Sequence, residues 1–285
     1  MPFTEFHGLR LFVPETALFP GLHVAVTTRE GGVSQGAYAA LNLAAHVGDD
    51  PVTVAANRDR LEATLRLPSR PCWLRQVHGT AVADADTLGA AHPDGPPVAD
   101  AAVTRGGAVL AILTADCLPV VIAMPDRAGG EVRFGVAHAG WRGLAAGVLE
   151  STVDALERRG GLRPAARAWL GPAIGPSAFE VGDEVRAAFT HDDAGAAAAF
   201  LRNPRGRWQA DLFLLARRRL TAAGVVTVLG GGVCTHSDAT HWYSYRRDAS
   251  AGADTGRFAT LVWKGRDTLM PDSPAARAGS SVRCG

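Results

Sequence analysis

The stretch from Trp73 to Ala137 carries one apolar, β-branched run after another, with no helix-length segment between them. Within it the pattern predicts strands at residues 73–77, 108–113, 118–124 and 133–137. Several of these runs are continuously apolar, which is typical of strands that are covered on both faces. The regular alternation of strand and helix is missing here, so the pattern argues against a doubly wound fold.

Outside this stretch, further strands are predicted at residues 22–28, 166–170, 225–229 and 259–263, and helices at 52–65, 144–159, 182–189 and 212–223. The first helix follows Asp49-Asp50-Pro51, which supplies acidic capping and a proline suited to the first turn. Strands mixed with helices indicate a layered α/β (α+β) fold. There is no internal repeat or long linker, so we expect one domain over residues 1–265. The tail over 266–285 is rich in Ala, Ser, Gly and Arg and is predicted to be loosely ordered.

The charge balance and the cysteine count restrict the partners and the compartment. Lys and Arg number 29 against 28 Asp and Glu, a net charge of +1, so nucleic acid is not expected as the main partner. The start lacks the features of a signal peptide, and no window approaches the ~18–20 apolar residues that a membrane helix needs. Four widely spaced cysteines, Cys72, Cys117, Cys234 and Cys284, are typical of reduced thiols. We therefore expect a cytoplasmic protein without a membrane partner.

Three short segments each place a metal-competent or nucleophilic side chain beside a predicted strand end. They are RQVHG with His78, TADCLP with Cys117, and VAHAGWRG with His138. Strand ends of one sheet can converge in space although 39 and 21 residues separate these three side chains. Taken singly, each side chain has a structural interpretation. A lone cysteine between apolar strands is more often a packed thiol, and a lone histidine at a strand end is usually hydrogen-bonded within the fold.

If the three side chains converge, they form a His₂Cys ligand set that leaves the fourth position of a tetrahedral ion open. This is the pattern of a catalytic zinc site, where zinc lowers the pKa of its water to about 7. Asp116 adjoins the thiolate and is the candidate for orienting a ligand or transferring a proton. The same set suits copper, but Met124 is seven residues past Cys117, about 20 Å along an extended strand, too far for an axial ligand. Zinc is therefore favoured over copper.

A metal-free alternative uses Cys117 as a nucleophile with a histidine as its base. The sequence does not separate this use from the metal site, and Cys117 is essential in both.

Several rare strings occur in one order along the chain. They are LNL at 41–43 with HVGD at 46–49, Asn57-Arg58, RQVHG, LTADCLP, AHAGWRG, GPAIGP at 171–176, Cys234-Thr235 and YSYRRD at 243–248. In these strings the chain resembles the YfiH-like proteins, also called the peptidoglycan editing factor or polyphenol oxidase family and related to laccase domain-containing protein 1. The resemblance runs from about Val26 to Val262.

The resemblance implies a layered α/β/β/α fold with mixed sheets, related to the catalytic domain of a bacterial deamidating toxin. It implies a zinc site at the positions of His78, Cys117 and His138. Activities of the family include deamination of adenosine and phosphorolysis of adenosine, inosine and methylthioadenosine, so a purine nucleoside and phosphate are the expected partners. Two rival activities are an amidase that releases L-Ser from the peptidoglycan precursor UDP-MurNAc-L-Ser, and a copper polyphenol oxidase. A purine-sensing module without turnover is the non-enzyme hypothesis, and a monomer or homodimer is expected.

Phosphorolysis needs a pocket that holds phosphate near the C1′ carbon of ribose, and arginine forks suit such a pocket. Asn42 is the candidate for binding ribose or base, and Ser244, between two tyrosines, is a candidate hydrogen-bond partner of the substrate. The arginine candidates are Arg58, Arg75, Arg142 and Arg246, whereas Arg247 is expected to be structural.

Overall fold

The computed structural model describes residues 3–88, 95–249 and 254–265, and two six-stranded sheets form the centre of the fold. The first sheet contains, in spatial order, β1 (Phe3–Phe6), β2 (Leu9–Phe12), β3 (Leu22–Thr27), β15 (Phe258–Lys264), β7 (Val109–Thr114) and β4 (Pro71–Cys72). The pairs are antiparallel except for β4, which runs parallel to β7 at the edge. Strands from both ends of the sequence therefore meet in one sheet.

The second sheet is built around a long hairpin. Its spatial order is β14 (Thr227–Gly230), β10 (Arg167–Leu170), β8 (Leu118–Pro125), β9 (Val132–Ala139), β6 (Ala101–Thr104) and β5 (Val82–Asp84). Strands β8 and β9 are antiparallel, and Pro119 lies opposite His138 in their register. Both sheets mix parallel and antiparallel pairs, as expected.

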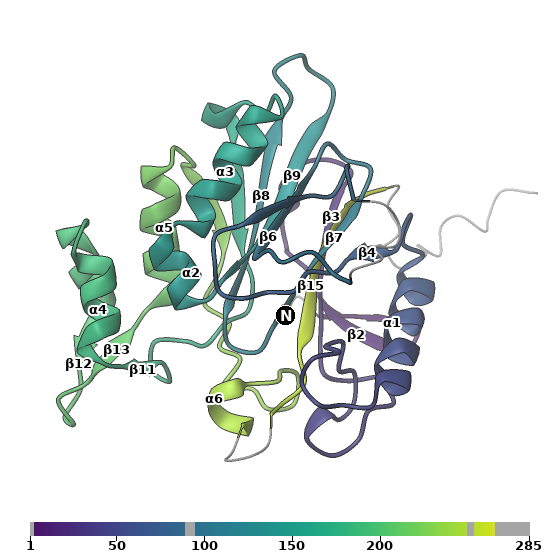
Figure 1. The fold of residues 1–285 in the computed structure, drawn as a ribbon, viewed down its shortest axis with the longest axis horizontal. Coiled ribbons are helices and arrows are strands. Elements are labelled where there is room, and N and C mark those ends of the chain that lie inside the picture. Colours follow the sequence, from purple (N-terminus) through teal and green to yellow (C-terminus); the bar gives the residue numbers. More distant parts are fainter. Residues whose placement is uncertain (1–2, 89–94, 250–253, 266–285) are drawn as a thin grey trace, which may run out of the picture.

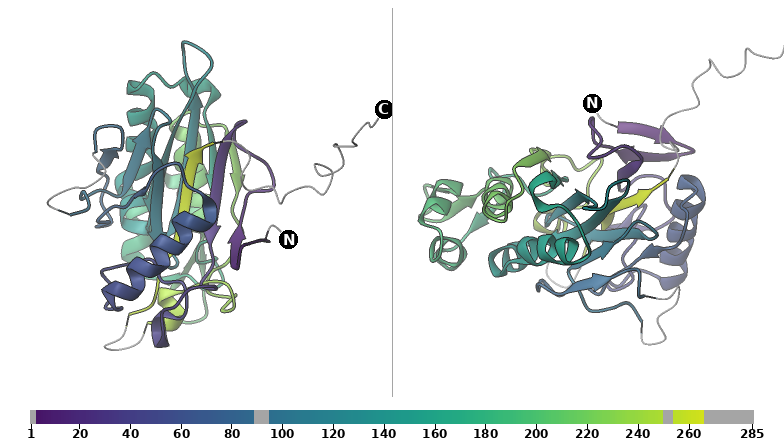
Figure 2. Two further views of the ribbon diagram at one scale, coloured as in Figure 1. Left: turned by 90° about the vertical axis from the view of Figure 1, so that its right-hand side faces the viewer. Right: turned by 90° about the horizontal axis from the view of Figure 1, so that it is seen from above.

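The two sheets pack face to face, and helices cover their outer faces (Figures 1 and 2). Ile112 of the first sheet and Val121 of the second belong to the core between the sheets. Helix α1 (Pro51–Leu65) packs Leu61 against the outside of the first sheet. The resulting layers are α/β/β/α, which confirms the expected fold.

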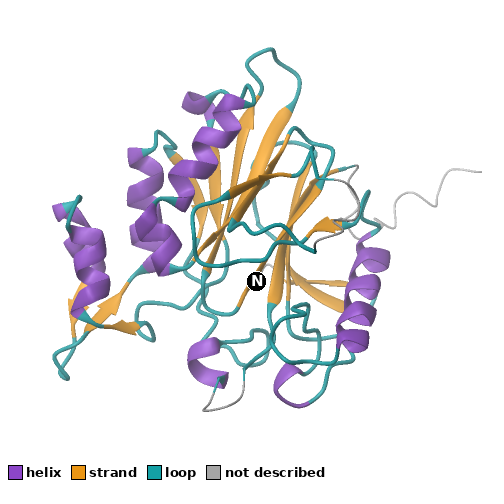
Figure 3. Cartoon of the chain, in the orientation of Figure 1, coloured by secondary structure: helices purple, strands orange, loops and turns teal. Residues whose placement is uncertain are grey.

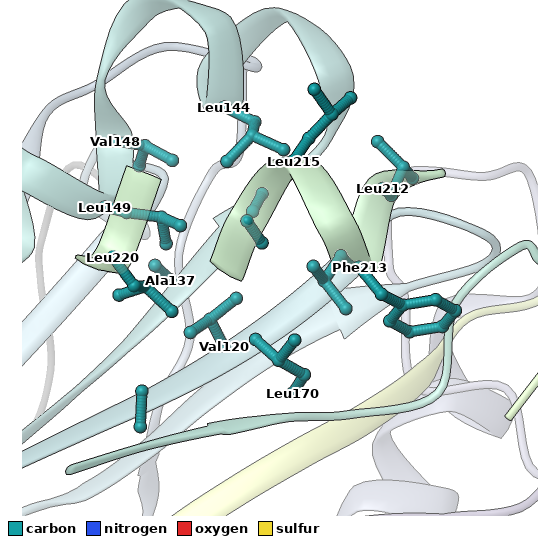
Figure 4. Packing of buried hydrophobic residues seen from close by; sticks show 14 of the residues in the cluster. Val120, Ala137, Leu144, Val148, Leu149, Leu170, Leu212, Phe213, Leu215 and Leu220 are labelled. Atoms are coloured by element: carbon teal, nitrogen blue, oxygen red, sulfur yellow. The ribbon is translucent and has the colours of Figure 1, made fainter. Parts of the chain in front are cut away.

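Three helices cover the outer face of the second sheet: α2 (Trp141–Ala146), α3 (Val148–Arg158) and α5 (Leu212–Ala222). Figure 4 shows Leu149 and Leu220 from these helices above Val120 and Ala137 of the sheet. All four side chains are fully buried, so this contact fixes the helices against the strands that carry the candidate site.

A third, small sheet stands apart from the two main ones (Figures 1 and 3). It has the order β11 (Glu180–Val181), β13 (Trp208–Ala210) and β12 (Phe200–Arg202), and it lies beside α4 (Asp183–Thr190) and the 3₁₀ helix Ala194–Ala199. Two further 3₁₀ turns, Gly36–Tyr38 and Arg163–Ala165, and the short helix α6 (Tyr245–Asp248) complete the elements. Strands this short were not predicted from the sequence, because two or three residues show no periodicity.

Helix α1 begins and ends as the sequence predicts. Asp50 is the N-cap, and its carboxylate accepts hydrogen bonds from the backbone amides of Val52 and Thr53, with Pro51 in the first turn. At the other end Arg66 adopts a left-handed conformation, with φ of 48°, and closes the last turn.

Two predictions of secondary structure are wrong. No strand forms at 73–77. The chain pairs with β7 at Pro71–Cys72, just before this range, and within the range it makes one isolated bridge, between Arg75 and Val98. The helix expected at 144–159 begins earlier, at Trp141, and is divided by Gly147, whose φ of 101° ends α2 and starts α3. The break in the helix thus follows from a local glycine.

The expected tail over 266–285 lies outside the described residues, and the single domain over 1–265 stays a prediction. Among the helices of the described residues, none is long and apolar enough to cross a membrane.

Candidate functional site

Cys117 lies where the chain crosses from one sheet to the other. Strand β7 of the first sheet ends at Thr114 and strand β8 of the second begins at Leu118, so the crossing takes only residues 115–117. Within it Asp116 has a φ of 87°, a costly conformation for a residue with a side chain. This short turn projects the Cys117 thiol from the junction of the two sheets.

The strain at Asp116 is held by four hydrogen bonds. Its carboxylate accepts from the hydroxyls of Thr235 (2.6 Å) and Ser244 (2.9 Å) and from the backbone amide of Arg246 (2.7 Å). Its carbonyl accepts from the amide of Ile174 at 2.9 Å. These contacts give Asp116 a positioning role, whereas its proton-transfer role stays a prediction.

His138 lies inside β9, one residue before the strand ends, and is almost fully buried. Its Nδ1 donates to Oδ1 of Asp100 at 2.8 Å, which directs Nε2 toward the other two candidate ligands. Asp100 is itself fully buried just before β6. The pairing of a carboxylate with the outer nitrogen of a histidine is the usual support of a metal-binding imidazole.

His78 lies in a loop that the same Asp100 carboxylate holds. The backbone amides of Val77, His78 and Gly79 donate to Asp100 at 3.1, 2.8 and 2.7 Å. His78 adopts a left-handed φ of 60°, which these bonds stabilise. One buried carboxylate therefore orients both candidate histidine ligands.

The structure brings His78, Cys117 and His138 together. Their ligand atoms all lie within 4.8 Å of one another, and Nε2 of His78 is 3.8 Å from Sγ of Cys117. A tetrahedral zinc ion with ordinary bond lengths requires a nitrogen–sulfur separation of about 3.5 Å, so the set fits one ion after a small adjustment. No other cluster of this kind is present among the described residues.

Gly140 makes this approach possible. A Cβ atom added there would lie 2.8 Å from Cδ2 of His78 and 3.0 Å from Sγ of Cys117. The first distance is shorter than real Cβ contacts and the second is tighter than most of them, so a side chain here would displace the ligand segments. Their close packing therefore favours a glycine just before α2.

Electrostatics favour the thiolate form of Cys117. Burial opposes ionisation, but the positive charge of His138 and hydrogen bonds from His138 and His78 outweigh it and lower the pKa of Cys117 to about 6. Burial likewise acts against the imidazolium of His138, but the Cys117 thiolate and the Asp100 carboxylate raise its pKa. A thiolate at neutral pH is the form that binds a metal ion or attacks an electrophile.

A cavity of about 460 Å³ opens beside the three candidate ligands, which form part of its wall. Its other walls carry cationic, aromatic and amide side chains. The cationic ones are Arg142, Arg246 and Arg257, the aromatic ones are Trp141, Phe179 and Tyr245, and Gln76 is the amide. His46 also lines the cavity, where burial and the charge of Arg257 lower its pKa and favour the neutral imidazole. Asp116 is the carboxylate among the described lining residues, and its oxygens are already hydrogen-bonded.

Residues 23–265 match the family described as multi-copper polyphenol oxidoreductase laccase. The chain belongs to this family. The match covers most of the chain and includes all three candidate ligands, so the resemblance to the YfiH-like proteins is confirmed.

Relatives in this family carry another name. A protein of Pseudomonas aeruginosa named purine nucleoside phosphorylase is 53% identical over 245 residues, covering 85% of this chain and 93% of its own. Purine nucleoside phosphorylase YfiH of Escherichia coli is 46% identical over 255 residues, covering 89% of this chain and 98% of its own. These names indicate that the family contains enzymes.

Solved structures of the family share the fold. A protein of Neisseria meningitidis superposes with a TM-score of 0.78 at 43% identity, covering 89% of this chain and 98% of its own. YlmD of Geobacillus stearothermophilus superposes with a TM-score of 0.80 at 30% identity, covering 93% of this chain and 99% of its own.

Two of the predicted substrate residues lie at the cavity. Arg142 stacks over Trp141 at 4.5 Å, and Arg246 lies over Phe179 at 5.7 Å while donating to the carbonyl of Glu180. Within the described part of the chain neither guanidinium has a carboxylate partner. Both are therefore placed to meet an anion in the cavity.

The structure places the other predicted substrate residues away from the cavity lining. Asn42 is fully buried, and its amide bonds to the backbone of Ala44 and Arg257 and to Asp49. Ser244 caps α6 and donates to Asp116. These contacts give both side chains a structural role in the family fold.

The other two predicted arginines, Arg58 and Arg75, lie outside the cavity. Arg58 donates to the carbonyl of Leu43 and stacks over Trp73 at 4.2 Å, and its burial lowers its pKa to about 10. Arg75 is exposed beside its bridge to Val98. Neither side chain lines the cavity.

Sequence reasoning missed several residues of the site. Asp100 gives no local signal, because it is a single acidic residue before an alanine-rich strand. Arg257 is likewise isolated in the sequence. The others were within the family-like strings and could have been found there: His46, Gln76, Trp141 and Tyr245.

Proposed function

We propose that the protein is a zinc-dependent purine nucleoside enzyme that cleaves adenosine, inosine and methylthioadenosine by phosphorolysis and deaminates adenosine to inosine. The observation that carries the proposal is the cavity, where the His₂Cys cluster shares one space with arginines and aromatic rings. Relatives named purine nucleoside phosphorylase support it.

The cavity side chains suit the two substrates. The rings of Trp141, Phe179 and Tyr245 offer apolar surfaces for a purine or ribose. Arg142 and Arg246 are the arginines best placed for phosphate, because Arg257 is paired with Asp254. In phosphorolysis a phosphate oxygen bonds to C1′ while the bond from C1′ to the purine nitrogen breaks, and the arginines hold the phosphate in place for that attack.

The donor chemistry of the cluster fits zinc. Two imidazole nitrogens and one thiolate are a common catalytic zinc set, and when bound, zinc polarises a substrate group or activates water. A single cluster of three donors accommodates one ion, and no methionine is among the described lining residues, so zinc is preferred to a copper centre. Asp100 holds the tautomer of His138, and Gly140 leaves room for the ligands to converge.

The test combines metal analysis with product chromatography. The wild type, Cys117→Ala and a control, Cys72→Ala, are purified without added metal and incubated with each nucleoside, with and without phosphate. Cys72 is a suitable control because it lies on β4 and outside the lining of the cavity. We expect about one zinc per chain in the wild type and in Cys72→Ala. We expect loss of zinc and at least a ~100-fold fall in turnover in Cys117→Ala.

The products separate the rival functions. Free base that depends on phosphate reports phosphorolysis, and inosine from adenosine reports deamination. Zinc-loaded protein that is inert to nucleosides but releases serine from UDP-MurNAc-L-Ser would replace the proposal with the editing amidase. Bound copper with oxygen consumption would replace it with the oxidase, and nucleoside binding without any product would indicate a sensing module.

A further inference from the structure

Thr114 is the last residue of β7 and lines the cavity at the point where the chain leaves the first sheet. It pairs with Phe258 in the register of β15, and Phe258 belongs to the core between the sheets. Since side chains alternate along a strand, Thr114 points to the same face as Ile112, which lies in that core as well. Its side chain therefore lies where the core between the sheets ends and the cavity begins.

The hydroxyl of Thr114 is buried without a hydrogen-bond partner. The residue is 1% exposed, and Oγ1 has no partner among the residues that the structure describes. A buried hydroxyl without a partner is unfavourable in a folded protein, so such groups call for an explanation. Among the described side chains that carry such an atom, Thr114 alone lines the cavity.

The backbone around this hydroxyl is fixed. The amide of Gln76 donates to the carbonyl of Leu113 at 2.8 Å and accepts from its N–H at 2.9 Å. On the other side of the strand β15 completes the pairing, and Asp116 anchors the turn that follows. A β-branched side chain on such a strand has few rotamers, so the hydroxyl is held in place before a ligand arrives.

We propose that Thr114 is a specificity-determining residue, whose Oγ1 forms a hydrogen bond with the nucleoside in the cavity. The inference rests on the proposed function and adds a neutral polar contact to the cationic and aromatic walls. The hydroxyl can donate one bond and accept others, so its partner is a sugar hydroxyl or a ring nitrogen of the purine. A ligand with this atom satisfies the hydroxyl, whereas an analogue that lacks it leaves the hydroxyl unpaired.

Thr260 provides a matched control. It lies on β15 opposite Ile112, it is fully buried, and its Oγ1 also has no partner among the described residues. It does not line the cavity. The two threonines therefore share one sheet face and one state of burial, and they differ in that Thr114 lines the cavity.

The experiment compares Thr114→Val, Thr114→Ser and Thr260→Val with the wild type in melting temperature and in steady-state phosphorolysis. Both valine variants should melt at or above the wild-type temperature, because each removes a buried hydroxyl that has no partner. Thr114→Val should lower kcat/KM for adenosine roughly 10-fold, whereas Thr114→Ser should largely restore it and Thr260→Val should leave it unchanged. A purely structural role would alter melting without this difference in kcat/KM.

Analogues then identify the contacted atom. Adenosine is compared with its 2′-deoxy, 3′-deoxy, 3-deaza and 7-deaza forms on the wild type and on Thr114→Val. The analogue that lacks the partner atom should be turned over equally by both proteins. An active wild type with an unchanged Thr114→Val would overturn this inference alone. A zinc-loaded wild type that is inert to all nucleosides would overturn the proposed function and this inference with it.

Discussion

Asp100 is the single residue on which the candidate ligand geometry most depends. Its carboxylate accepts four hydrogen bonds, one from Nδ1 of His138 and three from the backbone of residues 77–79. Burial acts against ionisation, but the bonds from His138, Gly79 and Val77 outweigh it and lower the pKa of Asp100. The carboxylate is therefore charged at neutral pH and can orient two ligands from different segments at once.

Replacement of Asp100 by asparagine should weaken zinc binding. An amide retains the shape of the side chain but turns NH₂ toward groups that donate, so His138 and the His78 loop lose part of their support. We expect the dissociation constant for zinc to rise about 10- to 100-fold. Competition with a chromogenic chelator below the melting temperature measures this change.

Asp126→Asn is the control for this substitution. Asp126 is also hydrogen-bonded within a turn of the second sheet, where it pairs with Arg133, but it lies outside the lining of the cavity. The Asp126→Asn variant should have a lower melting temperature than the wild type but the same dissociation constant for zinc. Equal zinc affinity in Asp100→Asn and wild type would show that the ligands need no such support.

At the scale of elements, the start of α2 packs directly against two candidate ligands. Gly140 precedes Trp141, the first residue of this helix, and has no space for a Cβ atom. Gly140→Ala should displace His78 or Cys117 by several tenths of an ångström and lower the zinc content by at least about 10-fold. Gly107→Ala is the control, because a Cβ there meets nothing within 4 Å. Full zinc loading of Gly140→Ala, measured by elemental analysis, would contradict this account.

The strong strands and helices could be predicted because their patterns are local. The buried runs of β7 and β8 read as nearly continuous apolar segments, β3 does so apart from His23, and α1 carries its cap in the sequence. Strand β6 was missed because it is only four residues long and begins with two alanines, which are depleted in strands. Local propensity thus predicted the elements that carry a long apolar run or a recognisable cap.

The expected strand at 73–77 failed for a reason that no local pattern contains. Gln76 uses its side-chain amide to satisfy the backbone of Leu113, where a neighbouring strand would otherwise pair. Asp100 then turns residues 77–79 away from the sheet edge. The metal site was predicted on the condition that His78, Cys117 and His138 converge. The cause of that convergence is the Asp100 carboxylate, which lies 22 residues from His78 in the sequence. Hydrogen bonds between residues this far apart in the sequence cannot be predicted from the spacing of the motifs.

At the scale of the whole molecule, the candidate ligands connect the two sheets. His78 lies between β4 of the first sheet and β5 of the second, Cys117 lies in the crossing from β7 to β8, and His138 belongs to β9. An ion held by all three would tie both crossings to the second sheet. Metal binding should therefore stabilise the fold as a whole, since the unfolded chain does not bring these residues together.

Removal of the metal should lower the melting temperature of the wild type. At a free zinc concentration about 1,000 times the dissociation constant, binding contributes about 4 kcal/mol, which corresponds to roughly 10 °C in a chain of this size. Differential scanning fluorimetry of zinc-loaded and chelator-treated protein measures the difference, and Cys117→Ala should melt at one temperature under both conditions. The contrary outcome is a wild type whose zinc is absent by elemental analysis and whose melting temperature is nevertheless unchanged. The hydrogen bonds of Asp100 would then suffice to hold the segments that connect the two sheets, and the ion would not contribute to stability.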